Sequence, residues 1–104
     1  MVTWMAFENI NIRRIVGTAL SNDAIIIDVR EATRFHSGHI PMAMNVPVEE
    51  IELGHVHFPK TRVLIVYCDT GASSIRAARI LSNMGYRVIT CVGGLKNYKA
   101  SLTK

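Results

Sequence analysis

The sequence has few cysteines, no long apolar run and little excess charge, and each of these absences excludes a class of protein. Two cysteines, Cys68 and Cys91, are too few for a disulfide framework or a zinc cluster. No apolar run approaches the roughly 20 residues that a membrane-spanning helix needs. Residues 1–5 lack the basic region and the long apolar stretch of a signal peptide. We therefore expect a cytoplasmic protein with no membrane partner, in which both thiols are reduced.

The charged residues give little support for a nucleic-acid or metal partner. The formal net charge of +4 suits anionic substrates or partners. The basic residues are scattered, however, and no basic run is interleaved with aromatic residues, so we expect no nucleic-acid binding. His55 and His57 could share one face of a strand, but no further ligand accompanies them. We assign neither a metal nor another cofactor.

The length and composition predict one domain over residues 1–104. A chain of 104 residues is large enough to bury a single core without disulfides or metals. Its hydrophobic share of 49% and charged share of 19% are typical of globular proteins. No repeat, linker or low-complexity segment divides it.

Apolar runs alternate with segments of helical period along the chain. Strands are predicted at residues 24–29, 43–46, 62–67 and 88–92, and helices or helical turns at 12–19, 31–36, 49–51, 74–84 and 95–102. Asn11 is the expected cap of the first helix, and Gly85 the expected stop of the helix over 74–84. Apolar strands that alternate with helices predict an α/β fold, with a mainly parallel sheet covered on both faces.

Cys68 is the strongest candidate for a reactive residue. Ligands of parallel sheets bind at the carboxyl ends of strands, where Asp28, Cys68 and Gly93 all fall in this prediction. Cys68 also lies at a turn from a strand to a helix, beside the backbone N–H groups of the loop and of the first helical turn. Those donors and the positive helix end favour a thiolate. The sequence therefore predicts a nucleophilic cysteine in an anion-binding loop.

Three other residues are predicted to be structural. Asp28 and Arg30 lie at the end of a buried strand, where a carboxylate needs hydrogen-bond partners, which backbone groups or His39 could supply. Cys91 lies within an apolar strand, as free cysteines often do, and we expect it in the core. A resolving cysteine that forms a disulfide with Cys68 is the alternative.

Two groups of motifs resemble those of a rhodanese domain. The first comprises Asp28-Val29-Arg30-Glu31, Phe35, Gly38-His39-Ile40-Pro41, Ala43 and Asn45-Val46-Pro47. The second comprises Tyr67-Cys68, Gly71, Ser74, Ala77-Ala78, Leu81, Gly85-Tyr86 and Gly93-Gly94. The resemblance runs from about Asp28 to Tyr98. It implies a three-layer sandwich with a central, mainly parallel sheet of about five strands. The helix expected before it fits a complete single-domain member.

The resemblance also implies a chemistry. Cys68 would take a sulfane sulfur from a small anionic donor such as thiosulfate, a polysulfide or a persulfide. The resulting persulfide would pass the sulfur to a thiol acceptor, for which a protein thiol is a further candidate. The loop residues Asp69, Thr70, Gly71, Ala72, Ser73 and Ser74 would hold the substrate, with Gly71 allowing the N–H groups to turn inward. Ser73 or Ser74 is expected to cap the helix.

Arg34 is the best candidate for an anion clamp. In some longer rhodanese-like sulfurtransferases an arginine at this spacing from the strand-end aspartate faces the pocket. The alternative is a solvated arginine on a short helix. Family members often carry cations where this chain has Asp69 and Ser73, and glycine where it has Met42. The missing cations predict weak affinity for thiosulfate.

Other activities remain to be compared with sulfur transfer. A phosphatase loop of this kind needs an arginine six residues after the cysteine, where this chain has Ser74, so we reject phosphatase activity. Arsenate reduction is less excluded, because it needs only a thiolate and an anion-binding loop. The remaining alternative is a non-enzymatic rhodanese-like module that carries sulfur, docks a partner or senses redox state. Retention of Cys68 argues against a purely structural role.

Overall fold

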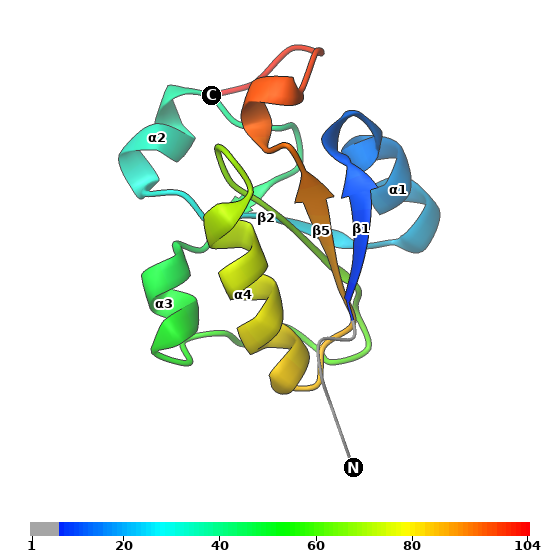
Figure 1. The fold of residues 1–104 in the computed structure, drawn as a ribbon, viewed down its shortest axis with the longest axis vertical. Coiled ribbons are helices and arrows are strands. Elements are labelled where there is room, and N and C mark those ends of the chain that lie inside the picture. The colour runs from blue at the N-terminus through cyan, green and yellow to red at the C-terminus, as the bar shows by residue number, and fades with distance from the viewer. Residues whose placement is uncertain (1–6) are drawn as a thin grey trace.

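The computed structural model describes residues 7–104, which form a five-stranded parallel sheet with helices on both faces (Figure 1). The strands are β1 (Phe7–Asn11), β2 (Ile25–Asp28), β3 (Met44–Asn45), β4 (Leu64–Tyr67) and β5 (Val88–Val92). Their order in space is β1-β5-β4-β2-β3, and all neighbouring pairs are parallel. This architecture confirms the predicted α/β sandwich.

The helices divide between the two faces of the sheet. They are η1 (Ile12–Arg14), α1 (Ile15–Asn22), α2 (Ala32–Ser37), α3 (Val48–Glu52), α4 (Ala72–Asn83) and η2 (Leu95–Asn97). One apolar core contains side chains of α3 and α4, and the other contains side chains of η1 and α1. The Asn11 side chain accepts a hydrogen bond from the Arg13 N–H at 2.9 Å, which confirms the predicted cap.

The central strand β4 explains why the apolar run in the sequence is continuous. Leu64 and Val66 pack into the core under α3 and α4, whereas Ile65 and Tyr67 pack into the core on the opposite face. All four side chains are fully buried. Because successive side chains of a strand point to opposite faces, a strand covered on both sides has no solvent-facing position.

Two elements differ from the sequence prediction. β1 was not predicted; it is an edge strand that pairs with β5 alone, and its side chains are partly or fully exposed, so the apolar signal is weak. The helix predicted over 95–102 was wrong. Only the short η2 turn forms, and the following chain is held instead by paired hydrogen bonds of 2.8 Å between the backbones of Thr103 and His39.

Across residues 7–104, the helices are too short or too polar to cross a membrane. The prediction made from residues 1–5 lies outside the described residues.

The carboxyl ends of β2, β4 and β5 and the start of α4 lie at the same edge of the sheet (Figure 1). Asp28 pairs with Tyr67 in the register, so the end of β2 lies beside the residue that precedes Cys68. Gly93 follows directly on β5, the other neighbour of β4. The structure thus brings Asp28, Cys68 and Gly93 to one edge, as predicted.

Met42 occupies a backbone conformation that suits glycine. Its φ angle is 74°, and the Ala43 N–H donates to the Ile40 carbonyl at 3.1 Å across the turn. Proline followed by a residue of positive φ is the type II turn pattern, whose third position favours glycine. A side chain there costs about 1–2 kcal/mol in backbone strain.

We therefore predict that Met42→Gly raises the free energy of unfolding by about 0.5–1 kcal/mol, because relief of strain exceeds the entropy that glycine adds to the unfolded chain. Met44→Gly is the matched control. The two side chains are similarly exposed, at 52% and 49%, but Met44 lies in β3. Urea unfolding should show a gain for the first variant and a loss for the second. A loss of similar size in both would contradict the assignment of strain.

Candidate active site

The thiol of Cys68 accepts hydrogen bonds from the loop that follows it. Cys68 comes directly after β4 and is 4% exposed. The Gly71 N–H donates to its Sγ at 2.9 Å, and the Ser74 N–H donates at 3.4 Å. Donors of this kind stabilise a negative charge on sulfur. The loop can turn inward because Gly71 adopts a φ of 108°, which disfavours residues with a side chain.

The two serines of the loop have different positions, and the predicted serine cap was wrong. The N-terminal cap of α4 is Gly71, which offers no side chain. The hydroxyl of Ser74 is fully buried and donates to the Gly71 carbonyl at 3.0 Å, and the Thr90 hydroxyl donates to it at 3.3 Å. Ser74 therefore braces the loop from within the core. Ser73, by contrast, lines the cavity above Cys68.

The turn after β5 supports the cysteine loop from the other side. The Leu95 N–H donates to the Cys68 carbonyl at 2.8 Å. Gly94, with a φ of 67°, lies so close to the backbone of Asp69 and Thr70 that a Cβ there would overlap it. The Gly93-Gly94 pair is visible in the sequence, but only the fold reveals that the second glycine allows this contact.

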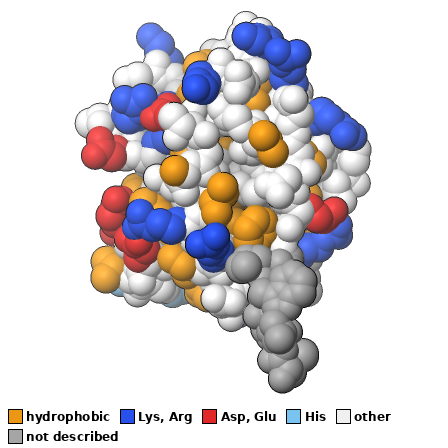
Figure 2. Space-filling model, in the orientation of Figure 1, with side chains coloured by type: hydrophobic (Ala, Val, Ile, Leu, Met, Phe, Trp, Pro, Cys, Tyr) orange, Lys and Arg blue, Asp and Glu red, His pale blue; other side chains and the backbone are white. Residues whose placement is uncertain are grey.

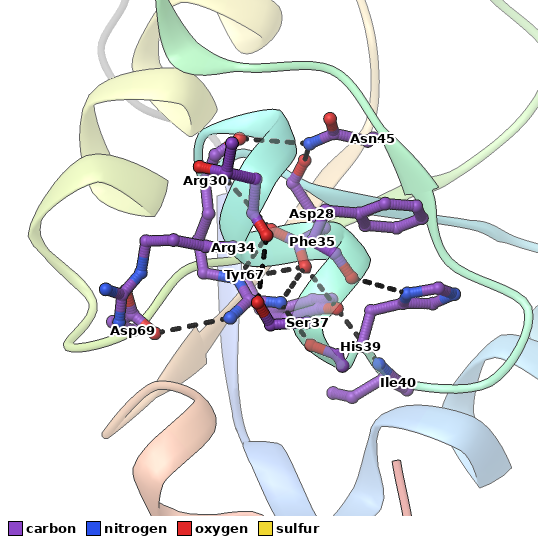
Figure 3. Close-up of polar contacts among 12 residues, drawn as sticks. Asp28, Arg30, Arg34, Phe35, Ser37, His39, Ile40, Asn45, Tyr67 and Asp69 are labelled. Atoms are coloured by element: carbon purple, nitrogen blue, oxygen red, sulfur yellow. Dashed lines mark hydrogen bonds and ion pairs between the residues drawn. The ribbon is translucent and has the colours of Figure 1, made fainter. Parts of the chain in front are cut away.

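Beneath the loop, a buried network joins Asp28 to its neighbours (Figure 3). Asp28 is fully buried, and its two carboxylate oxygens accept hydrogen bonds from the Arg30 side chain at 2.6–3.0 Å. Arg30 Nη2 also donates to the Gly38 carbonyl at 2.7 Å. The Tyr67 hydroxyl donates to Asp28 Oδ2 at 2.6 Å and accepts from the Ile40 N–H at 3.1 Å. The predicted structural role of Asp28 and Arg30 therefore has a clear basis.

The surroundings of Tyr67 and Arg30 shift the pKa of both side chains upward. Burial, followed by the hydrogen bond to Asp28, raises the pKa of Tyr67, so its hydroxyl remains a donor. Burial acts to lower the pKa of Arg30, but Asp28, with smaller contributions from Tyr67 and Asp69, outweighs it and the net shift is upward. His39 takes no part, contrary to one expectation: its Nδ1 lies 2.8 Å from the Phe35 carbonyl and its ring stacks on Phe35.

A cavity of about 400 Å³ opens above the thiol at this edge. Its lining comprises Val29, Arg30, Glu31, Arg34, Val48, Glu49, Cys68, Asp69, Thr70 and Ser73. Arg34 therefore lines the same cavity as Cys68, and its role as an anion clamp stays a prediction. Its Nε, however, lies 2.7 Å from Asp69 Oδ2, and this hydrogen bond raises the pKa of the Arg34 guanidinium (Figure 3). The sequence gives no signal for that pairing.

Three other residues, Arg76, Ala72 and His55, are not part of the cavity lining. Arg76 is exposed and forms an ion pair with Glu52 of α3, where acidic and basic side chains lie next to one another (Figure 2). Ala72 is exposed and does not line the cavity. His55 Nδ1 lies 2.9 Å from Glu50 Oε1. Within residues 7–104, no three histidine, cysteine or acidic side chains are grouped so that they could hold a metal ion.

Comparison with known proteins places this site in a family. The family model described as the rhodanese-like domain matches residues 16–101, which is more than the motifs alone covered. The chain belongs to the rhodanese-like family.

Named relatives agree with that placement. A protein named sulfurtransferase from Allochromatium vinosum is 33% identical over 76 residues, which are 72% of this chain and 71% of the relative. Thiosulfate sulfurtransferase PspE of Escherichia coli is 36% identical over 73 residues, 68% of this chain and 70% of the relative. A crystal structure from Staphylococcus saprophyticus shares the fold, with a TM-score of 0.83 at 23% identity, over 94% of this chain and all of that one.

Cys91 of this rhodanese-like chain has the surroundings of a core residue. It is 2% exposed and packs in the core beside η1 and α1, whereas Cys68 packs in the core beside α3 and α4. Burial, with a smaller contribution from Cys68, raises the pKa of the Cys91 thiol to about 12. A neutral, enclosed thiol is a poor nucleophile, which disfavours the resolving-cysteine alternative.

This shift makes stability depend on alkaline pH. The unfolded chain should lose the Cys91 proton near its ordinary pKa of 9.0, whereas the folded chain holds it to about 12. We predict that the free energy of unfolding falls as pH rises from 9 to 12, by about 1 kcal/mol per unit more than in Cys91→Val. Urea unfolding across this range measures the difference. The two curves should run parallel below pH 9, and parallel curves above it would contradict the buried-thiol assignment.

Proposed function

We propose that this rhodanese-like chain is a sulfurtransferase that carries a sulfane sulfur as a persulfide on Cys68. The observation that carries the proposal is the Sγ atom of Cys68, which accepts two backbone N–H hydrogen bonds at the floor of a cavity. The family and the names of the relatives support sulfur transfer in general.

In the first half of the reaction, the Cys68 thiolate attacks the outer sulfur of the donor. A sulfur–sulfur bond forms to Sγ, and the bond between that sulfur and the donor breaks. The leaving group departs with the electron pair, as sulfite if the donor is thiosulfate. In the second half, an acceptor thiolate or cyanide attacks the outer sulfur and Cys68 leaves as thiolate. Two displacement steps of this kind are covalent catalysis, and no net oxidation is needed.

Each loop group has a role in these steps. The N–H groups of Gly71 and Ser74 stabilise charge on sulfur before attack and after release. Thr70 and Ser73 line the space where the outer sulfur would lie. Arg34 is the more exposed of the two arginines of the cavity, since Arg30 is buried and held by Asp28, but Arg34 is itself paired with Asp69.

The position of Ser74 also weighs against the phosphatase alternative. A phosphatase of this loop type needs a guanidinium at that position to grip phosphate. Here the Ser74 side chain is buried and bonded to the Gly71 carbonyl, so it offers nothing to a bound anion.

We predict that incubation with thiosulfate or polysulfide adds the mass of one sulfur atom to the Cys68 peptide, and that cyanide removes it as thiocyanate. Cys68→Ser should abolish both steps and remain folded, because the hydroxyl is of similar size but a poor nucleophile. Cys91→Ala is the matched control. It should keep most of the activity and lose about 1–2 kcal/mol of stability to the small cavity left.

The outcomes separate the alternatives. A folded protein that gains no sulfur from any donor would contradict the proposal and favour a docking module. Sulfur that loads onto Cys68 but passes only to a protein thiol, and not to cyanide or small thiols, would favour a sulfur carrier. An inactive but folded Cys91→Ala would restore the resolving-cysteine alternative.

A further inference from the structure

The wall of the Cys68 cavity is negative although the chain as a whole is positive. Its lining residues include two arginines, Arg30 and Arg34, and three acidic residues, Glu31, Glu49 and Asp69. The chain carries a formal net charge of +4. A small dianion that approaches the thiolate therefore meets a local excess of negative charge rather than the attraction that the net charge suggests.

The arginines of the wall are already engaged. The Nε and Nη2 of Arg30 are bound to the buried Asp28 carboxylate and to the Gly38 carbonyl. Its remaining nitrogen, Nη1, lies 3.5 Å from Asp69 Oδ1. With its side chain 6% exposed, Arg30 cannot turn toward a ligand without breaking the buried network. The cation that could meet a ligand is therefore Arg34.

Arg34 is held by the residue next to the nucleophile. Its Nε lies 2.7 Å from Asp69 Oδ2, and the two side chains are 57% and 35% exposed. Both residues also line a second cavity, of about 320 Å³, together with Arg30, Ser37, Gly38, Leu95 and Leu102. Arg34 and Asp69, with Arg30, are thus shared between the two cavities. An anion that binds the Arg34 guanidinium competes with Asp69 for its charge, whereas a neutral donor leaves the pair in place.

We propose that Asp69 acts as an internal competitor for Arg34. It makes the site select donors whose sulfane sulfur is carried on a neutral or positively charged group, such as a persulfide of that kind, over small dianions such as thiosulfate. This inference rests on the proposed function, since it names the class of donor. Asp69 acts through Arg34 and through its own charge, and is a specificity-determining residue rather than a catalytic one.

The charge at the thiol can be measured without sulfur transfer. Methanethiosulfonate reagents react with a thiolate to form a mixed disulfide and release methanesulfinate, so atoms and electrons balance in one displacement. Three reagents that carry a trimethylammonium, a sulfonate or only a methyl group probe the same Cys68 Sγ with positive, negative and no charge. The ratio of the cationic to the anionic rate reports the electrostatics, and the neutral reagent reports intrinsic reactivity and access.

In the unaltered chain we expect the cationic reagent to react faster than the anionic one at low salt. Asp69→Asn should lower that ratio by about three- to tenfold, the effect of one charge several ångströms from the thiol. Arg34→Gln should raise the ratio of the cationic to the anionic rate in the unaltered chain. The increase should be larger when Asp69→Asn is also present, because Arg34 is then no longer paired with Asp69. Asp23→Asn is the matched control. It removes the same charge from a side chain that is 93% exposed and outside the cavity lining, and should leave the ratio unchanged.

Sulfur-transfer kinetics then test the donor class. Asp69→Asn should raise kcat/KM for thiosulfate by a similar factor, and should change the value for a neutral persulfide by a much smaller factor. A reagent ratio that is the same in Asp69→Asn and in the unaltered chain would overturn the inference. The inference would also be overturned if Arg34→Gln changed the reagent ratio equally with and without Asp69→Asn, because Asp69 would then not compete with a ligand for Arg34. A third outcome is a reagent ratio that depends on Asp69 in a protein that transfers no sulfur. That outcome would overturn the proposed function but support the electrostatic role of Asp69.

Discussion

The buried ion pair between Asp28 and Arg30 is the interaction on which the rest of the site depends. A fully buried carboxylate is tolerated only when its charge is balanced and its oxygens are hydrogen-bonded. Arg30 supplies the charge and several of the hydrogen bonds, and Tyr67 supplies another. Within residues 7–104, no buried side-chain nitrogen or oxygen lacks a hydrogen-bond partner. Removal of one partner from such a pair typically costs about 3–5 kcal/mol, because the other charge is then buried without compensation.

The same pair fixes the position of the nucleophile from both sides. Tyr67 precedes Cys68 and donates directly to Asp28, while Asp69 follows Cys68 and lies within 3.5 Å of Arg30. The Cys68 carbonyl is held in turn by the Leu95 N–H. The cysteine is thus anchored through its neighbours and its backbone. Its side chain is left to receive the two N–H donors of the loop. Because the neighbouring residues and the backbone hold Cys68 in place, its sulfur atom can change its charge and its bonding partner without disturbing the core.

Glycine makes the second part of this arrangement possible. Gly71 turns the chain so that its own N–H and that of Ser74 point at one sulfur atom. Gly94 allows the turn after β5 to touch the loop backbone where any side chain would overlap it. The donors come from the backbone, so their direction is set by the fold. The side chains at the mouth remain free to set specificity, and in this chain they include the opposed charges of Arg34 and Asp69.

Sequence patterns predicted those parts of the molecule that rest on local chemistry. Strands β2, β4 and β5 are apolar runs, interrupted only by Asp28 and Thr90, because both faces of the sheet are covered there. The small and apolar side chains of α4 recur at helical spacing. β1 was not predicted because an edge strand is only half covered and shows a weak apolar pattern. The helix over 95–102 was predicted wrongly because the chain there leads to a pairing of Thr103 with His39, which is distant in the sequence. The Arg34–Asp69 pair and the bond from Tyr67 to Asp28 join residues that are 35 and 39 positions apart, so no local pattern reports them. The cysteine and its loop could be recognised in the sequence, whereas the pairing of the charged side chains around them could be seen only in the folded structure.

A crystal structure of the protein after incubation with polysulfide and removal of the excess tests the central claim most directly. The account predicts one additional sulfur atom on Cys68 Sγ, inside the cavity and within hydrogen-bond reach of the loop N–H groups, with the Asp28, Arg30 and Tyr67 network unchanged. An added sulfur on Cys91, or an unmodified Cys68 in protein that mass spectrometry shows to carry sulfur elsewhere, would contradict it.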